Sequence, residues 1–374
     1  MNSAAHKGWD GPDPATLDRW RELADNGAEP NPFYHPALLA PALSHLKNGT
    51  QVRMIEAREG SDLIGLMPML VKAHHARYAV RNATNWMHGQ CFFGAPLMRK
   101  GQEKPAWAGL LAQLDSVEAA GHFLHLDGLW LDGPVATALR QYCEENGRAI
   151  KLIARHERAL LQSDLSADTY WETHVRAKKR KEIRRLANRL SDLGTISHSR
   201  LDPGDDVAAW TEEFIALEST GWKGAHGTAL GSRDETRNFF REALPNAAQA
   251  GMLDMVRIDL DGAAIAMLVN FRLGGGAFSY KIAYDEKFAR YSPGVLVEID
   301  NLHAALADPT LDWMDSCAAP DHPMIDGIWA ERRTIGQFRV ALNGSGLGGL
   351  RRRTAFAATG LAEDAIGRIK GTAG

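Results

Sequence analysis

The residues best suited to chemistry lie in residues 280–296, which read Tyr-Lys-Ile-Ala-Tyr-Asp-Glu-Lys-Phe-Ala-Arg-Tyr-Ser-Pro-Gly-Val-Leu. The pattern predicts a strand at the start of this stretch, and Ser292 followed by Pro293 predicts the beginning of a helix. The free N–H groups at the start of a helix attract phosphate, and Gly294 would let a bulky anion approach the backbone. Arg290 adds positive charge just before the helix. The stretch therefore predicts a site for a phosphate-bearing donor, although an ordinary capped helix has the same pattern.

The predicted donor site depends on backbone amides that follow Ser292. In this prediction the Ser292 side chain caps the helix, and the N–H groups of Gly294, Val295 and Leu296 point outward. The residues expected to bind the donor are Arg290, Tyr291, Ser292, Gly294, Val295 and Leu296.

The strand before this helix carries two charged candidates, Lys281 and Asp285. Because side chains alternate along a strand, Ser279 and Lys281 are expected on one face, and Tyr280 and Tyr284, which would contact substrate, on the other. Lys281 would bind an acceptor carboxylate or a developing negative charge, and Asp285 is a candidate base or a structural residue. The alternative is a strand-end lysine and a turn aspartate in solvent.

A dense run of positive charge lies in residues 176–189, which read Arg-Ala-Lys-Lys-Arg-Lys-Glu-Ile-Arg-Arg-Leu-Ala-Asn-Arg. Ile183, Leu186 and Leu190 fall on one side of a predicted helix, so the lysines and arginines face water or a partner. The charged side of such a helix is most often simply exposed to solvent. The alternative is contact with phosphate on a cofactor, an acyl carrier protein or tRNA.

The composition limits the class of protein. A chain of 374 residues exceeds the usual size of one domain, so two domains are expected. A formal charge of −3 means that nucleic-acid binding would need a local basic patch. Cys91, Cys143 and Cys317 are scattered, and no apolar run approaches membrane-spanning length, so we expect a cytoplasmic protein without a membrane span. No metal site is expected, because His74 and His88 lack carboxylate or cysteine partners at ligand spacing.

The order of predicted elements is similar in the two halves of the chain. The first half predicts a hairpin, a helix, a strand, a helix and a strand at residues 52–57 with 64–71, 104–119, 123–127, 135–145 and 150–155. The second half predicts strands at 255–260, 264–272 and 277–284, a helix from 292, a strand at 311–316, a helix at 328–341 and a strand at 350–356. Two copies of one α/β unit, with a boundary near residue 165, explain this order.

The layout of hairpin, long strand, capped helix, strand and helix resembles that of the GNAT acyltransferases. The string Tyr-Lys-x-x-Tyr-Asp at 280–285, followed by Ser-Pro-Gly-Val-Leu at 292–296, is similar to the branch with doubled GNAT domains, the FemAB-like and CelD-like proteins. Further motifs that resemble this branch are Asn-Pro-Phe-Tyr at 31–34, Gly-Leu-Met-Pro at 65–68, Lys-Lys-Arg-Lys at 178–181 and Asp-His-Pro-Met-Ile-Asp at 321–326.

This resemblance implies an α/β fold of mixed sheets in two tandem GNAT-like domains. Residues 1–165 would form a domain without a donor site, and residues 166–374 a domain with one. In GNAT enzymes the diphosphate of acetyl-CoA rests on backbone N–H groups of a glycine-containing loop. Residues 291–296 keep the middle glycine of that loop and depart from its pattern at both ends. The implied co-substrate is acyl-CoA, with no metal.

The resemblance also implies site residues outside the strand and helix. In the GNAT layout the strand that ends at Asp315 parts from its neighbour at the acyl site, so Asp315 is a candidate base, and capping of the following turn is the alternative. Acceptor-binding residues follow a helical run in these families, which here implies Glu218, Trp222 and Lys223, with a surface helix end as the alternative. His322 is a further candidate base, because histidine titrates near neutral pH.

The sequence is compatible with three functions. The first is an N-acyltransferase that moves an acyl group from acyl-CoA or an acyl carrier protein to an amine of a small molecule or of a cell-envelope or polysaccharide precursor. The second is a FemAB-type transferase that uses aminoacyl-tRNA and holds it with the basic helix. The third is a non-catalytic scaffold in polysaccharide assembly.

Overall fold

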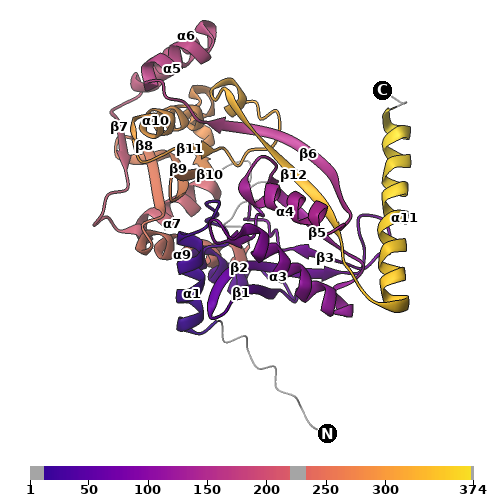
Figure 1. Ribbon diagram of the computed structural model, residues 1–374. Helices are drawn as coiled ribbons and strands as arrows, with labels where there is room; N and C mark the ends of the chain where they lie inside the picture. Colours follow the sequence, from indigo (N-terminus) through magenta and orange to yellow (C-terminus); the bar gives the residue numbers. More distant parts are fainter. Residues whose placement is uncertain (1–11, 220–232, 372–374) are drawn as a thin grey trace. The chain divides into compact units, whose positions relative to one another are not determined.

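The computed structural model describes residues 12–219 and 233–371, which form two compact units of strands and helices (Figure 1). Unit 1 contains residues 12–13, 35–48 and 157–333 of the described chain, and unit 2 contains residues 14–34, 49–156 and 334–371. Each unit has a sheet with both parallel and antiparallel pairs. The predicted α/β class with mixed sheets is confirmed. No helix among the described residues is long and apolar enough to cross a membrane.

The two units are not the contiguous halves that a single boundary near residue 165 would produce. Helix α2 (Pro36–His45) belongs to unit 1, where it packs on α9 (Asp234–Gln249) and pairs His45 with Glu242 at 2.7 Å. The C-terminal segment from Thr334 belongs to unit 2. The physical reasons are the packing of α2 on α9 and the pairing of β12 with β5, which a linear reading of the sequence does not reveal.

Unit 2 is built on a sheet in which the strands have the order β1, β2, β3, β5, β12 and β6, with β4 paired to β2. Its strands are β1 (Arg53–Glu59), β2 (Asp62–Lys72), β3 (Asn82–Asn85), β4 (Leu97–Met98) and β5 (Phe123–Trp130), with parts of β6 (Ile150–Leu161) and β12 (Glu331–Ala341). Its helices are α1 (Pro14–Asp25), α3 (Glu103–Ser116), the short 3-10 helix η1 (Glu118–Ala120), α4 (Pro134–Glu145) and α11 (Gly346–Gly371).

Two predicted elements at the C-terminal end were wrong. Residues 328–341, predicted as a helix, contain strand β12, which pairs antiparallel with β5 from Ile335↔Trp130 to Ala341↔Phe123. The spacing of Ile335, Phe338 and Leu342 resembles a helical stripe, but a central strand is buried on both faces and loses its alternation. Residues 350–356, predicted as a strand, lie inside helix α11.

Unit 1 is built on a sheet with the strand order β6, β11, β10, β9, β8 and β7. Its own strands are β7 (Ile196–Arg200), β8 (Leu253–Leu260), β9 (Ala263–Leu273), β10 (Gly276–Tyr284) and β11 (Trp313–Asp315). Its remaining helices are α5 (Ala167–His174), α6 (Ala177–Ser191), α7 (Val207–Ser219), α10 (Pro293–Ala307) and the 3-10 helices η3 (Glu286–Tyr291) and η4 (Ile325–Gly327).

The sheet of unit 1 is covered on both faces. On one face, Val256, Ile258 and Leu268 pack with Val297 of α10 and Leu190 of α6. On the other face, aromatic rings join the sheet to α7 and α9, since Phe271 lies next to Tyr280, Tyr280 stacks on Phe240, and Phe240 stacks on Phe214. These two layers explain the continuous apolar run of β9.

A buried ion cluster holds three strands of unit 1 together. Asp315, at the end of β11, is completely buried. Its carboxylate contacts Arg158 of β6 at 2.7 Å and Arg333 of β12 at 3.1 Å, and it accepts the backbone N–H of Cys317 at 2.9 Å. Arg333 also lies 3.8 Å above the ring of Trp313. Every member of the cluster therefore has an opposite charge or a hydrogen bond, as buried charges require.

Replacing Asp315 should destabilise the protein strongly. Asp315→Asn keeps the shape of the side chain but leaves two buried guanidinium groups without a counter-charge, so we expect a loss of about 3–5 kcal/mol in the free energy of unfolding. Urea unfolding followed by circular dichroism measures this loss. The control is Asp312→Asn, at an exposed position in the same segment, with an expected change within about 0.5 kcal/mol. Equal stability of the two variants would contradict a structural role for Asp315.

Candidate functional site

Strand β10 of unit 1 parts from its neighbour β11 after the first third of its length. The two strands pair in parallel at three positions only, from Gly276↔Trp313 to Phe278↔Asp315. Strand β11 then ends, and Cys317 has a φ of 54°, while β10 continues to Tyr284. Among the described residues no strand pairs with this edge of β10 after Phe278. The edge therefore offers backbone N–H and C=O groups to a bound ligand.

A β-bulge lies where the strands part. The register of β10 against β9 shifts between Ser279, which pairs with Asn270, and Lys281, which pairs with Val269. Tyr280 is the extra residue, so Ser279 and Lys281 lie on opposite faces of the sheet. The predicted alternation, with Ser279 and Lys281 on one face, was therefore wrong.

Contacts on each face confirm this assignment. Ile282 and Tyr284 pack in the cluster that contains Val297 of α10. Tyr280 instead lies in the aromatic layer beside α7 and α9, with its ring 4.9 Å from that of Phe271. The Nζ atom of Lys281 lies 5.4 Å from the centre of the Tyr280 ring. Lys281 therefore belongs to the α7 side of the sheet.

On the α10 side of the bulge lies a buried glutamate, Glu298, which is only 1 % exposed. Its carboxyl accepts the hydroxyl of Ser279 at 3.3 Å and the amide of Asn301 at 3.1 Å. Burial raises the pKa of Glu298 to about 7, although both hydrogen bonds act in the opposite direction. A carboxyl with a pKa near neutrality can gain and lose a proton under physiological conditions.

Glu298 is the inner end of a chain of polar side chains. The amide of Asn270 donates to Asn301 at 2.8 Å and to Asp254 at 3.0 Å. Asp254 in turn accepts two hydrogen bonds from Arg200, at 2.6 and 2.7 Å. The chain thus runs from Glu298, beneath the bulge, to the partly exposed guanidinium of Arg200. It fixes the orientation of Asn301 and hence of the Glu298 carboxyl.

The predicted anion site at the start of α10 was wrong in its details. Ser292 has a left-handed backbone with φ 54°, and its side chain makes no capping hydrogen bond. The N–H groups of Val295 and Leu296 are not free, because both donate to the carbonyl of Ser292, at 2.9 and 3.2 Å. Gly294 is buried, and a Cβ at that position would lie 3.1 Å from the ring of Tyr284. Tyr284 therefore covers the backbone that was expected to bind the anion.

The predicted donor site also included Arg290 and Tyr291, which precede this helix. Arg290 is exposed and lies over the buried ring of Tyr291, with 4.8 Å between the guanidinium carbon and the ring centre. This contact holds the guanidinium beside α10. Their role in donor binding stays a prediction.

The candidate bases occupy different environments. Asp285 caps η3 by accepting the N–H of Lys287 at 3.0 Å, and Asp315 is the centre of the buried ion cluster. For both carboxylates these contacts favour the structural alternative. His322 is half-buried, and its Nδ1 atom has no hydrogen-bond partner among the described residues.

The acceptor-binding predictions are only partly covered by the structure. Glu218 is buried near the end of α7, at 4 % exposure, rather than on a surface helix end. Trp222 and Lys223 lie outside the described residues.

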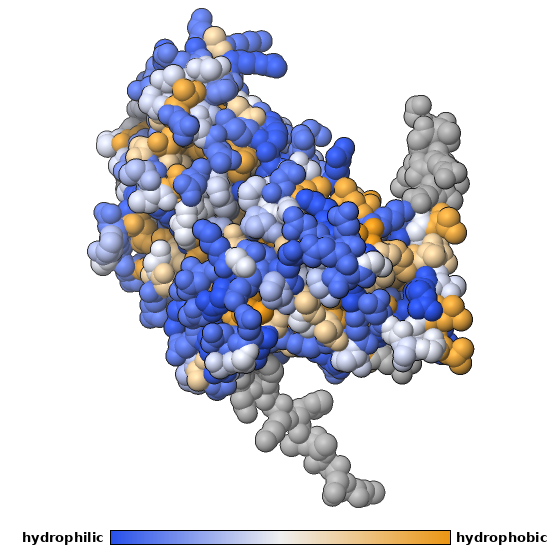
Figure 2. Space-filling view, viewed as in Figure 1, coloured by the Kyte–Doolittle hydropathy of each residue, from blue (hydrophilic) through white to orange (hydrophobic). Residues whose placement is uncertain are grey.

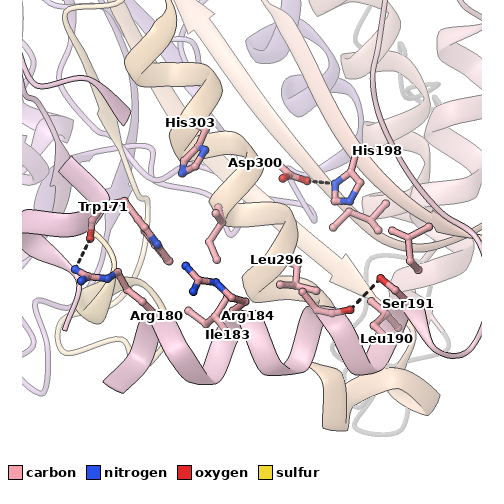
Figure 3. Close-up of a pocket in the computed structure, with 14 residues that line it drawn as sticks. Trp171, Arg180, Ile183, Arg184, Leu190, Ser191, His198, Leu296, Asp300 and His303 are labelled. Atoms are coloured by element: carbon pink, nitrogen blue, oxygen red, sulfur yellow. Dashed lines mark hydrogen bonds and ion pairs between the residues drawn. The ribbon is translucent and has the colours of Figure 1, made fainter. Parts of the chain in front are cut away.

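A second feature of unit 1 is a pocket of about 260 Å³ between α6, α10, β7 and β8, which we call the α6–α10 pocket (Figure 3). It is lined by Trp171, Arg180, Ile183, Arg184, Ala187, Leu190, Ser191, Ile196, His198, Ile258, Leu296, Ile299, Asp300 and His303. In this pocket Nδ1 of His198 lies 2.6 Å from Asp300, and this hydrogen bond raises the pKa of His198. Among the described residues no group of three or more His, Cys, Asp and Glu side chains could hold a metal ion.

Sequence reasoning missed Glu298, His198 and Asp300. The signal for Glu298 was present, because Glu298 and Asn301 fall on the same stripe of α10 as Val297 and Leu302, which is the buried stripe. A polar residue on an apolar stripe indicates a buried polar contact. No signal joined His198 to Asp300, which are 102 residues apart.

Residues 177–322 match the family model for the acetyltransferase (GNAT) domain. These residues form a GNAT domain. They lie within unit 1 and contain β10, its bulge and α10. No curated protein sequence matches this chain.

Three of the solved structures that match this chain illustrate the shared fold. FemX is 10 % identical with a TM-score of 0.57, and the match covers 86 % of this chain and 95 % of FemX. A conserved protein of unknown function from Bacteroides thetaiotaomicron is 11 % identical with a TM-score of 0.54, covering 88 % and 97 %. L-PGS from Bacillus licheniformis is 14 % identical with a TM-score of 0.54, covering 92 % and 97 %. The resemblance to the doubled, FemAB-like branch is thus confirmed for the fold, while that to CelD-like proteins stays a prediction.

The raised pKa of Glu298 predicts a specific pH dependence of stability. The folded state binds the Glu298 proton more tightly than the unfolded state, so the free energy of unfolding should fall as pH rises from about 4.5 to about 7. Glu298→Gln lacks this titration. Relative to this variant, the wild type should lose up to about 3 kcal/mol across that range and nothing more above it.

Urea unfolding at several pH values measures this difference. Glu144→Gln, at an exposed position of α4, is the matched control and should follow the wild type. Parallel curves for the wild type and Glu298→Gln would show that Glu298 does not have a raised pKa.

Proposed function

We propose that this protein is an N-acyltransferase that moves an acyl group from acyl-CoA or an acyl carrier protein to an amine. The observation that carries the proposal is the edge of β10 beyond Phe278, which has no strand partner among the described residues and lies in the GNAT domain. The acceptor is a small molecule or a precursor of the cell envelope or of a polysaccharide. This choice rests on the resemblance to the doubled branch.

The donor would bind along the unpaired edge of β10. The linear arm of CoA and of carrier proteins contains amide groups, which can pair with backbone N–H and C=O groups as an added strand does. An arm in this position brings the thioester to the bulge at Tyr280. Arg290 is exposed at the far end of the same segment and can approach the diphosphate.

The bulge would supply different groups to the two sides of the reacting thioester. On the α10 side, the amine proton passes to the hydroxyl of Ser279, whose own proton moves to Glu298. On the α7 side, Lys281 stabilises the negative charge that develops on the thioester oxygen or binds a carboxylate of the acceptor. The amine loses this proton as its nitrogen forms the new bond to the acyl carbon, and the carbon–sulfur bond then breaks so that the thiolate leaves. Ser279 and Lys281 would touch the substrates, while Glu298 acts through Ser279.

A second function is favoured by one observation, the charge of α6. The helix and its N-cap carry exposed cations at Arg176, Lys178, Lys181, Arg184 and Arg189. Figure 2 shows the hydrophilic surface over this part of the molecule, at the top of the view. An aminoacyl-tRNA donor would place phosphates on such a surface. A scaffold in polysaccharide assembly is the third alternative, and no contact among the described residues favours it.

Binding of CoA tests the donor. Acetyl-CoA at 100 times its Kd should stabilise the folded state by about 2.7 kcal/mol, a rise in Tm of roughly 5 °C in a thermal unfolding assay. Adenosine 3′,5′-diphosphate, which lacks the arm, is the control and should produce a much smaller rise. If acetyl-CoA has no effect and charged tRNA binds with strong salt dependence, the aminoacyl-tRNA alternative is correct instead.

Substitutions at the bulge test the chemistry. With acetyl-CoA and a panel of amino sugars, amino acids and polyamines, release of the CoA thiol should rise with pH through about 7 as Glu298 loses its proton. Glu298→Gln should lower kcat at least a hundredfold and abolish this rise. Lys281→Ala should also lower kcat but keep the pH profile, because Lys281 lies on the other face of the sheet. Lys100→Ala, at an exposed position of unit 2, is the control. An unchanged profile in Glu298→Gln would exclude this role.

A further inference from the structure

The α6–α10 pocket does not belong to the proposed transfer chemistry. Two sides of helix α10 have different neighbours. Glu298 and Asn301 face the polar side chains beneath β10. Leu296, Ile299 and Asp300 line the pocket. The following inference therefore stands independently of the acyl-transfer proposal.

The interior of the pocket is apolar. Isoleucine and leucine side chains come to it from four elements, namely Ile183 of α6, Ile196 of β7, Ile258 of β8, and Leu296 with Ile299 of α10. They enclose about 260 Å³ that no described side chain fills. Because apolar walls offer no hydrogen bonds to water, the pocket suits a hydrocarbon chain. The volume is enough for one short chain but not for the paired chains of a membrane lipid.

The rim of the pocket is cationic. Arg180 and Arg184 stand four residues apart on α6, so they lie on the same side of the helix. Arg180 is held in place because its guanidinium donates to the carbonyls of Trp171, at 3.3 Å, and Val175, at 2.9 Å (Figure 3). Both arginines line the pocket (Figure 3).

Arg184 has no acidic partner among the described residues. Its neighbour Arg185, in contrast, is paired with Glu182 at 2.6 Å. On the opposite wall, the charge of Asp300 is matched by His198 at 2.6 Å. Next to them the Nε2 atom of His303 is buried and has no hydrogen-bond partner in the described chain. Arg180 and Arg184 therefore outnumber the one acidic residue of the lining, Asp300, which is already bonded to His198.

We propose that the α6–α10 pocket binds a soluble anionic amphiphile with a single aliphatic chain, such as an alkyl phosphate or a medium-chain carboxylate. The chain occupies the apolar interior, and the head group accepts hydrogen bonds from Arg184, which a planar guanidinium can donate in pairs. His303 closes the polar side of the site. The ligand is reversibly bound, and no bond to it is made or broken.

Titration calorimetry on the full-length protein with octyl phosphate, octanoate and octanol tests this site. Octyl phosphate and octanoate should bind, and octanol should bind at least tenfold more weakly because it lacks the charge. Arg184→Gln should weaken octyl phosphate binding by about tenfold to a hundredfold, the effect of one charged hydrogen-bonding partner. Arg185→Gln is the matched control on the same helix and should bind as the wild type does.

A second variant separates the pocket from the surface charge. Ala187→Phe places a ring into the apolar interior, so it should prevent binding of octyl phosphate while α6 keeps all its arginines. Circular dichroism checks that both variants fold. The proposal is overturned if octanol binds as tightly as octyl phosphate, or if Arg184→Gln and Arg185→Gln bind equally. It is also overturned if the protein binds phosphatidylglycerol vesicles but neither soluble probe.

Discussion

One extra residue in β10 is the constraint on which the arrangement of the candidate site depends. Side chains normally alternate along a strand, so Ser279 and Lys281 would share a face. The bulge at Tyr280 places them on opposite faces, where Ser279 contacts Glu298 and Lys281 lies on the α7 side. The bulge coincides with the last pair between β10 and β11, Phe278↔Asp315. Groups of different chemistry therefore converge on one short length of unpaired strand edge.

The two buried acids near this edge differ because their surroundings differ. Asp315 lies between two guanidinium groups, so its negative charge is compensated and it serves to join three strands. Glu298 has only a hydroxyl and an amide as partners, and burial raises its pKa to about 7. The same functional group is thus a structural anchor in one position and a group that can exchange a proton in the other.

Helix α10 connects these features with the α6–α10 pocket. Its buried stripe carries Glu298 toward the sheet, and the neighbouring stripe presents Leu296 and Asp300 to α6. A ligand in the pocket would contact the helix that positions Glu298, although the two sites use different side chains. Arg184 lines the pocket and is also exposed, whereas Arg176, Lys178, Lys181 and Arg189 are exposed cations that do not line the pocket.

The sequence by itself determined the α/β class, the positions of most strands, the helix that begins after Ser292 and the likeness to GNAT proteins, because these depend on local periodicity and on short motifs. It could not determine the bulge at Tyr280, since one residue of register shift leaves no mark on a strand pattern. Only the tertiary structure decided that Tyr284 covers Gly294, that β12 is a strand, and that His198 meets Asp300. Each of these depends on contacts between segments far apart in the chain, where pairing and burial override local preference.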